Sequence, residues 1–225
     1  MVVFSTFSIT ARCPETGMLG VAVSTARPAV GSLAPYVKAG VGAIATQALV
    51  NPFYGIDGLN YLESGLSPEE VLEKLLAADE EKEKRQLAIV SNNGEVLGYT
   101  GSDTVPWQGH HLGEGFVVAG NMLTGPETLD AMKRTYETSQ KSFPEKLLDV
   151  LKSGQEAGGD KRGKQSAALY IVDTEQYPYI DLRVDEHSNP VAELIRVYRV
   201  CEKDLFPYTK NLPKRQKKGG GSSDE

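Results

Sequence analysis

The sequence predicts an α+β fold: a four-layer αββα sandwich, in which two antiparallel sheets face each other and helix pairs cover their outer faces. Strand-like segments come largely in hairpins and helical segments in pairs, in the order ββ-β-αα-ββ-β-αα-ββ-α. The alternating strand–helix units of a parallel, doubly wound sheet are absent. Segments 41–48 (VGAIATQA) and 166–172 (SAALYIV) are apolar at nearly every position, which predicts strands that are covered on both faces.

The strands are predicted from β-branched and aromatic runs between turn signals. Pro14–Gly17 and Asn92-Asn93-Gly94 mark two hairpin turns, and Asn-Gly between apolar runs is the strongest short hairpin signal. Gly20 and Gly42 lie inside strand-like segments, where we expect neighbouring groups to pack closely. The expected strands span residues 2–11, 18–24, 41–48, 86–91, 95–99, 115–120, 165–173 and 179–184.

The helices are predicted from their start signals and from apolar stripes at helical spacing. Ser67 can cap a helix whose first position is Pro68, and Glu70 completes a capping box. Ser142 with Glu145 predicts a second capping box. The other expected helices span residues 52–64, 126–139 and 144–152, and a last one starts at 189–190.

Composition excludes several classes of protein. The 225 residues carry a net charge of −6, which argues against nucleic-acid binding, and no apolar run approaches the ~20 residues of a membrane span. With two cysteines and three histidines we expect no disulfide, metal site or cofactor, and His110-His111 is interpreted as a solvated loop after Trp107. We expect a cytoplasmic protein with one domain over 1–207 and a disordered, basic and Gly/Ser-rich tail over 208–225.

Polar residues gather beside glycines and strand ends in five places. Arg27 follows a buried-looking strand and could hold a carboxylate, and Asn121, after Gly120, could donate an N–H to an oxyanion. The Gly158–Ser166 segment could cradle an anion, although composition alone favours a flexible charged loop by roughly two to one. Arg27 could equally be a surface arginine and Asn121 a turn asparagine. The five segments are 5–8, 24–32, 46–55, 113–123 and 158–166.

The same segments carry a resemblance to a known family. The chain resembles domain-of-unknown-function family 1028 over about residues 5–206, in order and with clustered identities. The resemblance rests on Thr6-Phe7-Ser8-Ile9, Leu19–Ser24, Pro28–Ser32, Ala45–Ala48, Asn51-Pro52, Gly113–Phe116, Gly120–Leu123, Ala157–Asp160, Gln165–Leu169, Asp181–Asp185 and Pro190–Leu194. That family is similar to the N-terminal-nucleophile (Ntn) hydrolases, whose fold is the αββα sandwich.

The resemblance implies a catalytic role for Thr6. In Ntn hydrolases the first residue of the mature chain attacks an amide carbonyl, and its own free α-amine accepts the hydroxyl proton. Asn121 or Thr46 would then serve the oxyanion hole. The residues placed around the substrate are Ser8, Arg27, Gln47, Asp160, Arg162, Gln165 and Ser166. Members of the family begin Met-Thr-Phe-Ser, whereas here residues 1–5 precede Thr6 and block its amine. Three alternatives follow: the chain cleaves itself between Ser5 and Thr6, its true start is different, or it is not catalytic by this route.

Three functions follow as hypotheses. The first is an amidohydrolase that cleaves a small amide or peptide after residues 1–5 are removed. The second is a non-catalytic protein that binds an anionic small molecule on the same scaffold. The third is a scaffolding subunit, whose polar segments would face solvent instead of one pocket. A homo-oligomer is compatible with all three, and neither a membrane nor a nucleic acid is expected as a partner.

Overall fold

The strands of the protein form two antiparallel sheets. The computed structural model describes residues 3–4, 6–209 and 211–215. The five-stranded sheet comprises β1 (Val3–Phe4), β4 (Pro35–Lys38), β5 (Gly42–Leu49), β6 (Arg85–Ser91) and β7 (Val96–Thr100). The six-stranded sheet, in the order β11-β10-β3-β2-β9-β8, comprises β2 (Thr6–Arg12), β3 (Leu19–Thr25), β8 (Gly109–Gly113), β9 (Phe116–Gly120), β10 (Ser166–Val172) and β11 (Ile180–Val184).

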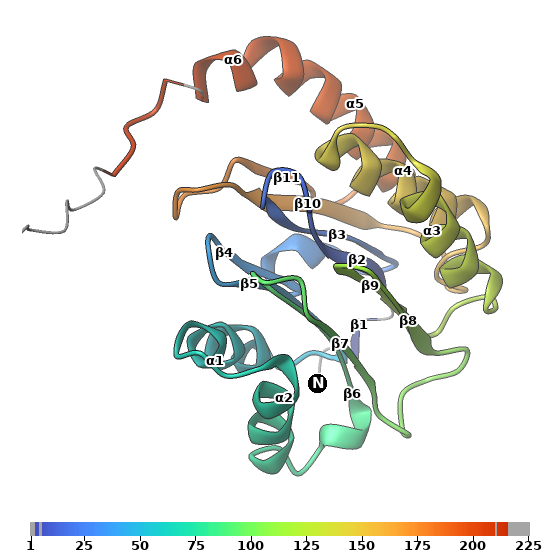
Figure 1. Ribbon diagram of the computed structural model, residues 1–225. Helices are drawn as coiled ribbons and strands as arrows, with labels where there is room; N and C mark the ends of the chain where they lie inside the picture. The colour runs from blue at the N-terminus through green and yellow to red at the C-terminus, as the bar shows by residue number, and fades with distance from the viewer. Residues whose placement is uncertain (1–2, 5, 210, 216–225) are drawn as a thin grey trace, which may run out of the picture.

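Helices lie on the outer side of each sheet (Figure 1). Ile44 and Ile89 of the five-stranded sheet pack under two helices, α1 (Pro52–Glu63) and α2 (Pro68–Ala77). The six-stranded sheet is covered by α3 (Glu127–Thr138), α4 (Phe143–Glu156) and α5 (Pro190–Asp204), and a short α6 (Phe206–Thr209) follows. A third apolar cluster, with Val21, Val23, Ala45 and Ala88 among its members, fills the space between the sheets. The prediction of two antiparallel sheets with helices is therefore confirmed.

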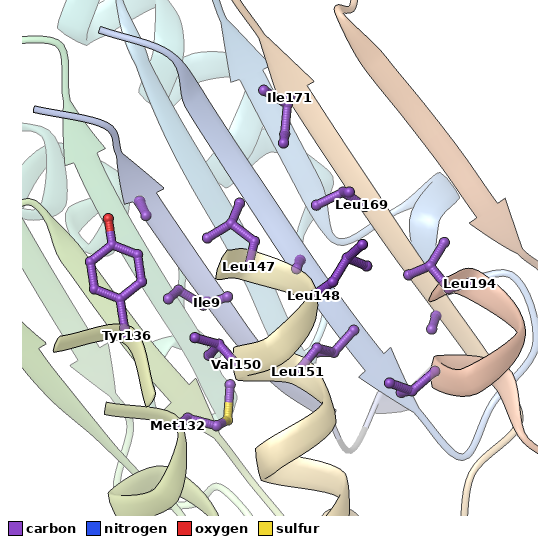
Figure 2. Packing of buried hydrophobic residues seen from close by; sticks show 14 of the residues in the cluster. Ile9, Met132, Tyr136, Leu147, Leu148, Val150, Leu151, Leu169, Ile171 and Leu194 are labelled. Carbon is purple, nitrogen blue, oxygen red and sulfur yellow. The ribbon is translucent and has the colours of Figure 1, made fainter. Parts of the chain in front are cut away.

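The largest core lies between the six-stranded sheet and its helices (Figure 2). Leu147, Leu151 and Leu194 of the helices are fully buried against Ile9 and Leu169 of the strands. Each such side chain stabilises the fold by about 1.5–3 kcal/mol through its removal from water. This core fixes strand β2, and therefore the position of Thr6, from one face.

Several local predictions can be checked against single contacts. The Ser67–Glu70 capping box is present in both directions. The Ser142–Glu145 box is wrong: the Ser142 hydroxyl makes no capping bond and instead donates to the Glu145 carboxylate at 2.6 Å. The expected close packing is confirmed, since a Cβ on Gly42 would lie 2.8 Å from the Val90 carbonyl oxygen.

Two strands were not predicted. Strand β4 contains Pro35 and Lys38 and has no apolar alternation, so only its pairing with β5 defines it. Strand β8 contains the two adjacent histidines, and the expectation that His110-His111 is a solvated loop is wrong: His110 pairs with Ala119 and His111 with Val118. The first predicted strand is divided, because β1 joins one sheet and β2 the other.

The remaining general predictions concern membranes and the tail. In the part of the chain that is described, no helix combines the length and the apolar character that a membrane crossing requires. Most of the predicted tail, residues 210 and 216–225, lies outside the described residues.

Candidate functional site

Thr6 is the first residue of strand β2 and lies where three strand ends meet. It pairs with Thr25, the last residue of β3, and its carbonyl oxygen accepts a hydrogen bond from the backbone N–H of Asn121, which follows β9, at 3.0 Å. The Thr6 side chain is fully buried. Its hydroxyl oxygen has no hydrogen-bond partner among the described residues. A buried hydroxyl without a partner is costly. Thr10, Thr46, Thr128 and Tyr54 share this property, so what distinguishes Thr6 is its place at the meeting point of the three strand ends.

The alternation of β2 points its polar residues into the space between the sheets. Phe7 and Ile9 belong to the core under the helices. Because successive strand residues face opposite sides, Thr6 and Ser8 face the five-stranded sheet. The Ser8 hydroxyl indeed donates to the side-chain oxygen of Gln47 on β5 at 2.8 Å. One serine–glutamine contact thus connects the two sheets directly beside Thr6.

A ladder of buried amides continues from Gln47. Gln47 Nε2 donates to Gln86 Oε1 at 2.7 Å, and Asn121 Nδ2 donates to the same oxygen at 3.0 Å. Gln86 lies on β6, so the ladder joins β2, β5, β6 and the end of β9. Gln47, Gln86 and Asn121 are each at most 1% exposed. A buried network whose members are bonded to one another makes the local geometry rigid.

The contacts of Gln86 determine which group donates and which accepts in each hydrogen bond of the ladder. Gln86 Nε2 lies 3.0 Å from the carbonyl oxygen of Gly109 and 2.9 Å from that of Gly120. A carbonyl can only accept, so this end of the side chain must be the NH₂ group. Gln47 must therefore present its NH₂ to Gln86 Oε1 and its oxygen to Ser8. Ser8 has to donate its only hydroxyl proton to Gln47, which leaves its lone pairs to accept a proton from a neighbour.

His110 terminates the network on the other side of Gln86. Gln86 Nε2 also lies 2.9 Å from Thr100 Oγ1, which lies 2.9 Å from His110 Nδ1. Burial, and then the charge of His111, lower the pKa of His110 below its ordinary value of 6.5. A neutral imidazole can accept the Thr100 proton at Nδ1. His110 is thus a half-buried end of the amide ladder.

The Gly158–Ser166 loop is tied to the strand ends around Thr6 through Asp160. The Asp160 carboxylate accepts a hydrogen bond from the Ala26 N–H at 3.0 Å and one from the Arg162 N–H at 2.9 Å. It also forms an ion pair with the Arg162 guanidinium at 2.9 Å. Asp160 is 3% exposed. Asp160 and Arg162 therefore hold the loop against β3 and offer little free charge to a ligand.

Other predicted substrate residues contribute through their backbone or lie on the surface. The Ser166 hydroxyl donates to the carbonyl oxygen of Arg27 at 2.6 Å and accepts from the Val30 N–H at 3.1 Å. The Arg27 side chain itself is exposed. The Gln165 N–H donates to the Thr25 carbonyl oxygen at 2.8 Å. Ser166 and Gln165 thus order the strand end that pairs with Thr6.

Thr46 is not brought together with Thr6. It pairs with Leu87 and shares its strand face with Ile44, and both of these residues pack under α1 and α2. Its side chain therefore lies on the outer face of the five-stranded sheet, whereas Thr6 faces the inner one. Of the two predicted oxyanion donors, only Asn121 lies beside Thr6.

Backbone strain is concentrated at the same end of the sandwich. Three non-glycine residues within the described ranges have a positive φ: Ala29 at 57°, Ala48 at 67° and Met122 at 53°. Ala48 and Met122 directly follow Gln47 and Asn121, and Ala29 lies four residues after Thr25. Such conformations cost of order 1–3 kcal/mol each and gather at functional sites. This distribution agrees with a site built around Thr6.

The residues before Thr6 are also placed. Val3 and Phe4 form β1, which pairs antiparallel with β5, Val3 opposite Leu49 and Phe4 opposite Ala48. The chain therefore changes sheets between Phe4 and Thr6. As it stands, the α-nitrogen of Thr6 is part of a peptide bond.

Sequence reasoning missed Gln86, Thr100 and His110. Gln86 is the one informative signal among them, because it is an amide in the otherwise apolar strand 86–90. The pairing of Thr100 with His110 depends on the sheets facing each other and has no local signature. No group of three or more potential metal-ligating side chains occurs in the described ranges.

Comparison with known proteins agrees with the resemblance. Residues 6–194 match the family described as "Family of unknown function (DUF1028)". The crystal structure of protein SPO2555 from Silicibacter pomeroyi, described with the same family name, is 29% identical, with a TM-score of 0.85 and coverage of 91% of this chain and 93% of that one.

A second solved structure, Anbu (ancestral beta-subunit) from Yersinia bercovieri, is 12% identical over 93% of this chain and 99% of that one. Its TM-score of 0.39 is too low to support a conclusion on fold or function. No curated protein matches the chain. The family match covers most of the sequence, and the chain therefore belongs to the DUF1028 family.

Proposed function

We propose that this protein is an N-terminal-nucleophile amide hydrolase whose nucleophile is Thr6 and which becomes active when residues 1–5 are removed. The observation that carries the proposal is the position of the fully buried Thr6 hydroxyl, which lies at the start of β2 beside the amide ladder of Gln47, Gln86 and Asn121. The match to the family, which begins at Thr6, supports the same residue. The two facing sheets with helices outside would then be the αββα layers of such enzymes.

The first step is self-cleavage of the bond between Ser5 and Thr6. Thr6 Oγ1 attacks the carbonyl carbon of Ser5, the C–N bond breaks, and the hydroxyl proton passes to the nitrogen. An ester on Thr6 and a free α-amine result. Water then hydrolyses the ester, which releases residues 1–5 with a terminal carboxylate and restores the hydroxyl. The step needs only water as a co-reactant, and the nucleophile gains its own base.

The same groups then act on a substrate amide. The Thr6 amine accepts the proton of Oγ1 as the oxygen attacks the substrate carbonyl, and it returns that proton to the departing nitrogen. The resulting acyl ester is hydrolysed by water. Ser8, which must accept because Gln47 takes its proton, would receive an N–H of the Thr6 amine and keep the lone pair of the nitrogen directed at Oγ1.

Asn121 is the proposed oxyanion donor. One of its two Nδ2 protons is used by Gln86, and the other can face the developing negative charge. Its backbone N–H meanwhile holds the Thr6 carbonyl oxygen. Removal of an oxyanion donor typically lowers kcat by 10²–10³.

The alternative of a non-catalytic binder of anionic ligands has less support. It would rely on the cations Arg27 and Arg162, but the Arg162 guanidinium is paired with Asp160. The Arg27 side chain is exposed, whereas Thr6 is fully buried.

The proposal is tested by amide hydrolysis with matched threonine variants. A panel of peptidyl and small-acyl arylamides should be cleaved by the wild-type chain, and Thr6→Ala should abolish turnover. Thr10→Ala is the control, because Thr10 is equally buried on the same strand face but two positions beyond Ser8. Full activity of Thr6→Ala, or equal losses in both variants, would contradict the role of Thr6.

A further inference from the structure

The backbone of strand β5 offers a binding edge beside Thr6. Strand β6 takes one side of β5, with pairs from Gly42–Ser91 to Ala48–Arg85. On the other side, β4 pairs with residues 42–45 and β1 pairs with Ala48 and Leu49. We call this second side, at Ala48 and Leu49, the β5 edge. Among the described residues, Val3 and Phe4 close it.

The β5 edge lies next to the proposed nucleophile by two independent connections. Only one residue separates Phe4 on this edge from Thr6 on the facing sheet. Gln47, the residue before Ala48, accepts the hydrogen bond from Ser8 across the two sheets at 2.8 Å. A strand on the β5 edge therefore delivers its C-terminal end to Thr6.

We infer that the β5 edge binds the acyl side of an extended peptide substrate, which pairs there as an antiparallel strand in the place that residues 3–4 now take. The inference rests on the proposed function, because the edge opens only when residues 1–5 leave. An exposed strand edge presents unpaired N–H and C=O groups and is a template for a further strand. Recognition by strand addition draws its affinity from the main chain of the ligand.

The chain itself indicates the polarity and chemistry of the ligand. Val3 and Phe4 run antiparallel to β5, so a substrate would lie with its N-terminal residues along Leu49 and Ala48 and its scissile carbonyl at Thr6. The released segment Met1–Ser5 is then the first product and an inhibitor of the open site. The substrate class is a peptide, or an amide with a peptide-like acyl chain, because a compact amide has no backbone to pair.

The first test uses the full chain and a synthetic peptide, acetyl-Met-Val-Val-Phe-Ser with a free carboxylate. Thr6→Ala prevents turnover, and Val3→Pro with Phe4→Pro removes the backbone N–H of both β1 residues, and with it the one that faces β5. This triple variant should bind the peptide, with Kd measured by calorimetry or NMR titration. Thr6→Ala alone, whose edge stays closed, should bind it at least about tenfold more weakly. Equal affinities would overturn the inference.

The second test separates main-chain pairing from other modes of binding. In an antiparallel ladder, alternate residues point their N–H toward the partner strand. N-methylation at one of the two positions equivalent to Val3 and Phe4 should therefore weaken binding about tenfold, and methylation at the other should have little effect. If both methylated peptides bind like the parent, the β5 edge is not the binding element.

If the proline variant fails to fold, as judged by circular dichroism, a chain that starts at residue 6 with Thr6→Ala replaces it in the first test.

A comparison of peptide binding with arylamide hydrolysis distinguishes this inference from the proposed function. Peptide binding without any Thr6-dependent hydrolysis in the wild type would contradict the proposed function and leave the β5 edge supported. Hydrolysis of arylamides at Thr6 that the pentapeptide does not inhibit would support the proposed function and overturn the β5 edge.

Discussion

The Ser8 hydroxyl donates to Gln47 Oε1 at 2.8 Å and thereby joins the strand that begins with Thr6 to the facing sheet. The two residues are far apart in the sequence and lie on different sheets. Their contact sets the direction of the Ser8 hydroxyl, because Gln47 is itself oriented by Gln86 and two backbone carbonyls. The proposed site therefore depends on how the two sheets are placed against each other.

Replacement of Gln86 should lower the stability of the fold and release the side chains of Gln47 and Asn121 from their present positions. Gln86→Leu removes the partner of Gln47, Asn121 and two carbonyls in a buried region, so we expect a loss of about 2–4 kcal/mol in the free energy of unfolding. Urea unfolding measures this loss. Gln176→Leu, at an exposed glutamine, is the control and should change stability by less than about 0.5 kcal/mol. A Gln86→Leu variant as stable as the control would contradict the ladder.

Because the Thr6 hydroxyl has no described partner, removing it should abolish activity without lowering the stability of the fold. Thr6→Val keeps the shape and removes a buried polar group without a described partner, so the full-length variant should be as stable as the wild type or more stable by up to about 1 kcal/mol. Ser8→Ala, which removes a hydrogen-bonded hydroxyl, should be less stable by about 1 kcal/mol. Thermal unfolding of both variants provides the comparison, and the reverse order would show that Thr6 has a structural partner.

The strained backbone at Ala48 gives a paired test. Ala48 has a φ of 67°, which glycine adopts without penalty. Ala48→Gly should therefore be neutral or stabilising, whereas Ala45→Gly in the same strand should lose about 0.5–1 kcal/mol. Equal losses for both variants, measured by chemical denaturation, would contradict the left-handed conformation at Ala48.

Stability at low pH should depend on Asp79. Burial by itself would raise the pKa of Asp79, but hydrogen bonds from Arg85, from the Glu81 N–H and from Asn51 outweigh it and hold the pKa well below its ordinary value of 3.8. A carboxylate with a lowered pKa stabilises the fold above its unfolded pKa, and this contribution is lost as the pH falls through the folded value.

We therefore expect the wild-type free energy of unfolding to fall as the pH drops below about 4, and the fall to be shallower in Asp79→Asn. Urea titrations between pH 7 and 2.5 measure the slope. Asp204→Asn, at an exposed position on α5, is the control and should keep the wild-type slope. Identical slopes in wild type and Asp79→Asn would contradict the Asp79–Arg85 pair, whose atoms Arg85 Nε and Asp79 Oδ2 lie 2.8 Å apart.

The two antiparallel sheets and most of the helices could be predicted from the sequence because their signals are local. Asn-Gly turns, capping residues and apolar stripes placed most strands and helices within a few residues, including the Ser67 cap. Strands β4 and β8 were missed because pairing, and not composition, defines them. The division of the first strand could not be seen either, since the residues on both sides of the sheet change are β-prone.

The candidate site was predictable only in part, because contacts between distant strands bring its residues together. Thr6, Ser8, Gln47 and Asn121 stood out through the resemblance and through polar residues at strand ends, and the structure brings them together. Thr46 was predicted as an oxyanion donor but lies on the outer face of its sheet. The strand is apolar on both faces, so the sequence does not show which residues point inward. Gln86 left only the weak signal of an amide in an apolar strand. The contact between Thr100 and His110 joins strands of different sheets and leaves no pattern in the chain.

The mass of the purified protein tests the central claim most directly. Intact-mass spectrometry of the full-length chain after incubation at neutral pH should show the loss of residues 1–5, so that Thr6 becomes the first residue, and Edman sequencing should then begin Thr-Phe-Ser. Thr6→Ala should retain all five residues, and Thr6→Ser should lose them more slowly. A wild-type chain that hydrolyses amides while it still carries residues 1–5 would contradict the account.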